Sequence, residues 1–156
     1  MSLHSRAVTI RDSGGSVNAM DRAQPVVLSL FRIIVAFLFV GHGLASLFGV
    51  LGGVSGRGDA LPVGTWPYWW AALIELVGGV LVLVGLGTRV AALVCSGTMA
   101  FAYFSVHQPR ALFPIQNEGE LAVLFCWAFL LVAIFGPGPW SLDRLVVPAA
   151  RRRVSG

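Results

Sequence analysis

The chain has 156 residues, of which 56% are hydrophobic and only 12% are charged, and its mean hydropathy is +0.81. This composition excludes a water-soluble domain, because soluble domains have about a quarter of their residues charged. The formal net charge of +4 includes no lysine, so every strongly basic side chain is an arginine. The size predicts one compact domain, and the composition places it in a membrane.

The first 24 residues contain serines, glycines and charges of both signs, without an apolar period. They predict a disordered cytoplasmic tail that ends at Pro25, a residue type favoured in the first turn of a helix. The apolar stretch that follows is longer than the core of a cleavable signal peptide, which spans about 7 to 15 residues. The first helix is therefore expected to remain as an uncleaved anchor.

Four apolar segments have about the length that a membrane-spanning helix requires. In chain order they are Val26–Phe48, Trp69–Leu86, Arg89–Val106 and Glu120–Gly136. The link between the second and third is so short and glycine-rich that these two helices are expected to form an antiparallel hairpin. The sequence thus predicts an all-α, integral membrane four-helix bundle over residues 25–143, followed by a basic cytoplasmic tail over residues 144–156.

The arginines are distributed unevenly among the segments outside the predicted helices. The two terminal tails and the hairpin carry eight of them, whereas the other two loops contain only Arg57 and Arg110. The positive-inside rule therefore predicts that both termini lie in the cytoplasm. The basic run Arg151–Arg153 is expected to bind anionic lipid headgroups, since no nucleic-acid-binding motif accompanies it.

Glu75 is the only charge in its strongly apolar segment. An ionisable group inside a bilayer costs about 3 kcal/mol, so it normally faces protein and marks a functional path. Counting about 1.5 Å per helical residue places Glu75 and His42 at the same depth, roughly 9 Å below the outer surface. Gly78 and Gly79 lie under Glu75, which indicates that this face packs closely on another helix.

Further polar residues are expected at the same outer level. The third helix ends with Tyr103 and His107, and Asn117, Glu118 and Glu120 precede or open the fourth helix. These residues predict an outward-facing pocket beside His42 and Glu75. The candidate ligand-binding residues are Tyr103, His107, Asn117 and Glu120.

Each of these features has a purely structural alternative. His42 and Glu75 at equal depth could form a buried pair that only fixes the register of two helices. Glu118 and Glu120 lie at a helix N-terminus, where the helix dipole favours acids, so capping is the alternative for both. No metal site is predicted, because no helical spacing places two ligands on one helix. Cys95 and Cys126 fall at different depths, which argues against a disulfide.

Five short motifs occur in an order and spacing that resemble the DoxX family, over about Leu28 to Asp143. They are Phe31-Arg32, Gly41–Gly49, Ile74–Gly79, Leu86–Arg89 and Asn117–Ala122. By this resemblance the family-like polar positions are Arg32, His42, Glu75, Arg89, Asn117 and Glu120. One position departs from the pattern, because many relatives have a lysine where this chain has Ser46.

The resemblance implies a multi-pass protein of the bacterial inner membrane, associated with the quinone pool, soluble redox partner proteins and resistance to oxidative stress. Within it, Arg32 and Arg89 are expected to be structural polar residues. Arg32 should lie too near the cytoplasm to pair with Glu75.

Two functional classes compete. In the first, a redox-linked subunit binds a quinone or a small sulfur species, and His42 and Glu75 are the catalytic residues that exchange protons with it. The chain has no haem, flavin or iron–sulfur motif, so any electron carrier must be a bound quinone or a partner protein. In the second class, a non-enzymatic scaffold docks partner proteins in the membrane. A transporter is a third choice, although a conduit between four short helices would require an oligomer.

Overall fold

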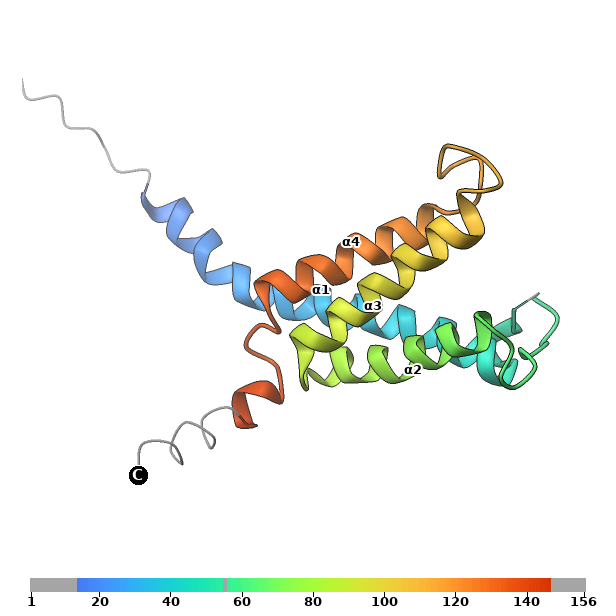
Figure 1. Cartoon of the computed structure of the whole chain (residues 1–156). Helices are drawn as coiled ribbons and strands as arrows, with labels where there is room; N and C mark the ends of the chain where they lie inside the picture. The colour runs from blue at the N-terminus through green and yellow to red at the C-terminus, as the bar shows by residue number, and fades with distance from the viewer. Residues whose placement is uncertain (1–13, 55, 147–156) are drawn as a thin grey trace, which may run out of the picture.

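The computed structural model describes residues 14–54 and 56–146, and every regular element in this part of the chain is helical (Figure 1). The four α-helices are α1 (Gly14–Phe48), α2 (Tyr68–Val84), α3 (Thr88–Ala102) and α4 (Glu120–Phe135). A 3-10 turn, η1 (Val50–Gly52), follows α1, and a π-helical turn, η2 (Tyr103–His107), continues α3. The expected all-α class is confirmed.

The start of α1 corrects one expectation. The helix begins at Gly14 and contains Pro25 in its interior, so residues 14–24 are helical where a disordered tail was expected. An interior proline removes one backbone hydrogen bond and crowds the carbonyl of residue i−4, but good helix formers such as Ala19, Met20 and Ala23 precede it. Residues 1–13 and the basic run at 151–153 lie outside the described residues.

The helices pack mainly in two pairs. The most extensive contacts join α1 to α2 and α3 to α4, α2 and α3 connect the pairs, and α1 has fewer contacts with α4. In Figure 1 the two pairs approach each other where α2 ends and α3 begins, and they diverge toward the other end. The polar residues of interest lie at these two ends.

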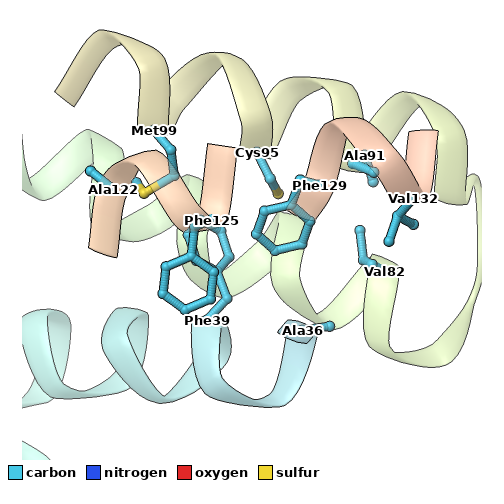
Figure 2. Close-up of a cluster of buried hydrophobic side chains, with 11 residues drawn as sticks. Ala36, Phe39, Val82, Ala91, Cys95, Met99, Ala122, Phe125, Phe129 and Val132 are labelled. Atoms are coloured by element: carbon cyan, nitrogen blue, oxygen red, sulfur yellow. The ribbon is translucent and has the colours of Figure 1, made fainter. Parts of the chain in front are cut away.

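A small aromatic core holds the pairs together (Figure 2). The ring of Phe39 in α1 lies 5.2 Å from that of Phe125 and 4.6 Å from that of Phe129, both in α4. Around them pack small or flexible side chains from the other helices, including Val82, Cys95 and Met99. These contacts fix α1 against α4, where direct helix contact is otherwise sparse.

Glycines bring the backbones of neighbouring helices together. A Cβ on Gly43 of α1 would lie only 2.7 Å from the backbone nitrogen of Leu76 in α2. A Cβ on Gly78 would lie 2.5 Å from the sulfur of Cys95 in α3. Small residues at helix crossings allow the close packing on which membrane helices depend.

The outer surface of the helices is apolar. Phe37 is 64% exposed, Leu93 58% and Ile134 61%. Within the described residues, Ala19–Phe48 and Thr88–His107 are long and apolar enough to cross a membrane by length and composition, while α2 and α4 are apolar but shorter. Such a surface is suited to lipid and would be a liability in water.

Candidate functional site

A cavity of about 190 Å³ lies at one end of the helices, where α1 ends and α2 begins. We call this region the histidine end and define it by His42, Glu75, His107 and Glu118. All four side chains border the cavity, and they come from α1, α2, η2 and the loop before α4. The remaining lining residues are Phe39, Met99, Ala102, Leu121, Ala122 and Phe125.

Glu75 is half-buried in α2 and has no hydrogen bond or ion pair with any residue in the described part of the chain. The residues one turn further along its own helix are the buried glycines Gly78 and Gly79, which have no side chain that could pair with the carboxylate. A carboxylate in such a place is costly unless a partner compensates it. The cavity is the side from which a partner can reach this carboxylate.

His42 lies across the cavity on α1. Its ring meets the edge of Phe125 at a centroid distance of 5.7 Å and remains partly exposed. No hydrogen bond joins His42 to Glu75 within the described residues, so the structure does not contain the register-fixing pair that was the structural alternative. Both groups are left available to a ligand.

His107 reaches the cavity through the π-turn. In η2 the backbone nitrogen of Gln108 bonds to the oxygen of Tyr103 at 2.9 Å, five residues back, which widens the turn and changes the direction of the side chains after it. The Nδ1 atom of His107 is 2.9 Å from the backbone oxygen of Asn117. The end of α3 is thus tied to the loop that leads into α4.

Asn117 does not line the cavity as expected. Its side chain is 1% exposed and is used within the loop, since Nδ2 donates to the oxygen of Ala111 at 2.8 Å and Oδ1 accepts from the nitrogen of Gly119 at 2.8 Å. Tyr103 is likewise outside the lining and packs against Gly119 and Phe104. Both residues shape the site without bordering it.

Of the two acids at the start of α4, the one that borders the cavity is not the one that was predicted. Glu120 is exposed at the first residue of the helix and does not border the cavity, whereas Glu118 does. Glu118 adopts a left-handed backbone conformation with φ of 58°, rare for a residue with a Cβ. No sequence signal marks this conformation at a glutamate, although the adjoining Asn117 and Gly119 are turn residues.

The cavity is not arranged as a metal site. Among the residues described, no three histidine, cysteine, aspartate or glutamate side chains come close enough to hold one metal ion. Cys95 and Cys126 are both free thiols, and the Cys126 sulfur lies 3.5 Å from the hydroxyl of Ser96.

The opposite end of the helices, which we call the arginine end, contains Arg32, Arg89 and Asp143. Arg32 has no exposed surface and donates to four backbone oxygens. The distances are 2.9 Å to Pro137 and 2.7 Å to Leu83, and the other two acceptors are Val82 and Trp140. Arg32 therefore caps the C-terminal end of α2 and fixes the segment after α4.

Arg89 and Asp143 cap two further helix ends. The Nη1 atom of Arg89 donates to the oxygens of Ala133 and Ile134 at 3.2 and 3.0 Å, near the end of α4. Asp143 accepts from the nitrogens of Gly87 and Thr88 at 2.7 and 3.0 Å and from the Thr88 hydroxyl at 2.7 Å, at the start of α3. Partial burial opposes ionisation of Asp143, but these bonds and the charge of Arg32 outweigh it and lower its pKa.

Two larger grooves, of about 960 and 780 Å³, lie on the outer surface of the helices. Their linings are predominantly apolar, with Arg144 and Gln24 at the first and Asp143 at the second. The smaller cavity is the better candidate for proton chemistry, because two histidines and two carboxylates face it. We therefore take the cavity at the histidine end as the candidate site.

Comparison with known proteins identifies the family of the chain. The model of the DoxX family matches residues 27–108. The chain is 38% identical to an uncharacterised protein of Haemophilus influenzae over 81% of its own length and 96% of the relative's. It is 30% identical to the inner membrane protein YqjF of Escherichia coli (81% and 97% covered) and 29% identical to a Bacillus subtilis protein named "Putative oxidoreductase CatD" (81% and 92%). No solved structure gives a significant match. The chain belongs to the DoxX family of membrane proteins.

Proposed function

We propose that the protein crosses the bacterial inner membrane four times, with both termini in the cytoplasm. The apolar outer surface of all four helices and the names of two Escherichia coli relatives support this location. The arginine end carries Arg22, Arg89 and Arg144 on or near helix ends, and the loops at the other end carry Arg57 and Arg110. By the positive-inside rule, the arginine end is cytoplasmic and the histidine end faces outward.

Within that topology, the proposed function is that of a redox-linked membrane subunit whose outer cavity binds a quinone headgroup or a small sulfur species. The observation that carries the proposal is the Glu75 carboxylate, which has no protein partner in the described part of the chain and borders a cavity with two histidines. The relative named as an oxidoreductase favours the same class.

The size of the cavity limits the ligand. Sites for drug-sized molecules occupy about 300 to 1,000 Å³, whereas this cavity has about 190 Å³. It accommodates a single ring or a molecule of a few atoms, and a longer isoprenoid tail would have to lie outside it, between the helices and the lipid.

The chemistry assigned to the site is proton exchange. A quinone becomes a quinol by taking up two electrons and two protons. In the proposed reaction a soluble redox partner protein supplies the electrons, and Glu75 and His42 each pass one proton to a ring oxygen. The reverse reaction returns both protons to these side chains and the electrons to the partner.

Binding of a short-chain benzoquinone to the purified protein in nanodiscs tests the proposal. Glu75→Gln and His42→Ala are expected to weaken binding at least tenfold and to reduce tolerance to oxidative stress in a strain that depends on the protein. Thr98→Ala is the matched control, because the Thr98 hydroxyl bonds to Val94 within its own helix and lies outside the cavity. If both site variants fold, bind quinone normally and protect cells, the redox function is wrong and a scaffolding role replaces it.

A further inference from the structure

The hydrogen bond of His107 determines which ring nitrogen carries the proton. Its Nδ1 atom lies 2.9 Å from the backbone oxygen of Asn117. A carbonyl oxygen can only accept a hydrogen bond, so Nδ1 must be the donor. In the neutral imidazole the proton therefore resides on Nδ1, and Nε2 has a free lone pair.

The carbonyl that determines this arrangement is itself held firmly. The buried Asn117 side chain spans its loop with two hydrogen bonds, to Ala111 and Gly119, each 2.8 Å long. On the other side, the π-turn fixes the backbone of His107 through the bond between Gln108 and Tyr103. Neither the ring nor its partner can rotate without breaking these contacts.

The second nitrogen of His107 is available to the cavity. Nδ1 and Nε2 point outward from the ring in widely different directions, so the bond to the loop directs Nε2 away from Asn117. The ring borders the cavity, and Nε2 has no hydrogen-bond partner among the described residues. The ionisable neighbours around the cavity are Glu75 from α2, His42 from α1 and Glu118 from the loop.

We propose that His107 is a fixed hydrogen-bond acceptor for the ligand and that Asn117 is the positioning residue that maintains this role. Building on the proposed function, the cavity then binds the quinol more tightly than the corresponding quinone. In the bound quinol the hydroxyl on the His42 side donates to Nε2 until the ligand is oxidised and its proton passes to His42, whereas a quinone oxygen has no proton to donate and leaves the lone pair unpaired. One such bond corresponds to a preference of about five- to tenfold.

Nitrogen-15 NMR of the full-length protein in nanodiscs, labelled at its three histidines, tests the acceptor role without any ligand. His107→Gln assigns the signal. We expect neutral His107 to carry its proton on Nδ1, and a proton on Nε2 would overturn the proposal. Asn117→Ala should give a mixture of both tautomers, while Gln108→Ala, which changes an exposed neighbouring side chain, should not. An unchanged spectrum in Asn117→Ala would remove the positioning role.

Titration with a short-chain quinol and the matching quinone tests the ligand preference. The wild type and Gln108→Ala should favour the quinol by about five- to tenfold, and in His107→Phe the ratio should fall to about one. Equal affinities in the wild type, or an unchanged ratio in His107→Phe, would refute the preference. If neither form binds, the proposed function fails and the preference with it, whereas the NMR result still decides whether His107 is an acceptor.

Discussion

The arginine end and the histidine end both place ionisable side chains among apolar helices, but the hydrogen bonding of Arg32 and Asp143 differs from that of Glu75. Arg32 is fully buried and donates to four backbone oxygens, and Asp143 accepts three hydrogen bonds at the start of α3. Glu75, in contrast, has no partner within the described residues and borders a cavity. The chain itself satisfies the polar groups that maintain the fold at the arginine end, and it leaves the Glu75 carboxylate at the cavity unsatisfied.

The largest effect on stability is expected at the arginine end. Arg32→Ala removes the donor to four backbone oxygens, and at about 1 kcal/mol for each net hydrogen bond the loss is about 4 kcal/mol. Denaturant titration in detergent measures it. Arg32→Lys keeps the charge but not the planar donor group and should be intermediate. Arg110→Ala, in an exposed loop, should change the free energy of unfolding by less than about 0.5 kcal/mol. If Arg32→Ala lowered the free energy of unfolding by less than about 1 kcal/mol, the structural role of the arginine end would be wrong.

The second-largest loss of stability is expected at the crossing of α1 and α2. Gly43→Ala places a Cβ 2.7 Å from the backbone nitrogen of Leu76, and because the backbone cannot move aside easily, we expect a cost of about 2 kcal/mol. Gly97→Ala is the matched control, since no atom lies within 4 Å of its added Cβ. The same denaturant titration compares the two. Equal stability of both variants would mean that α1 and α2 do not approach as closely as described.

A smaller and pH-dependent effect is expected for Asp143. Asp143→Ala removes the cap of α3 and should cost about 1 kcal/mol at neutral pH. Because the folded state lowers the pKa of Asp143, its contribution is complete above the unfolded pKa of about 3.9 and is lost as the pH falls through the lower folded value. Unfolding curves of wild type and variant should therefore converge in acid. Curves that stay equally far apart at low pH would argue against a charged cap.

No loss of stability is expected at Glu75. Glu75→Gln preserves the shape of the side chain and removes a charge that has no partner in the described part of the chain. Because an uncompensated carboxylate is costly among apolar helices, the free energy of unfolding should stay the same or rise. A destabilisation of 2 kcal/mol or more would show that Glu75 supports the fold, and the contrast between the two ends would disappear.

Much of the fold follows from hydrophobic length alone. The predicted segments for α2, α3 with η2, and α4 agree with the structure to within two residues, because long apolar runs leave few alternatives. The predicted start of α1 was wrong, since the helix begins at Gly14 and Pro25 is tolerated inside it. A proline restricts the local backbone, but whether a helix continues through it depends on the neighbouring sequence.

The site was less predictable than the fold. Matching depths correctly placed His42, Glu75 and His107 around one cavity. The assignment of Asn117 and Glu120 to the ligand was not supported, because the roles of residues 117–120 depend on the left-handed turn at Glu118 and on the bond from His107 to the loop. Asp143, whose capping role depends on contact with a helix start more than fifty residues away, shows the same limit.

The most direct test of the account is the stabilisation that a ligand gives to variants at the two ends. At a quinone concentration of 100 times its dissociation constant, binding should raise the free energy of unfolding of the wild type by about 2.7 kcal/mol. Asp143→Ala should begin from a lower stability and show the same gain, whereas Glu75→Gln should begin from at least wild-type stability and show almost none. A full gain in Glu75→Gln, or a gain lost in Asp143→Ala, would contradict the assignment of ligand binding to the histidine end.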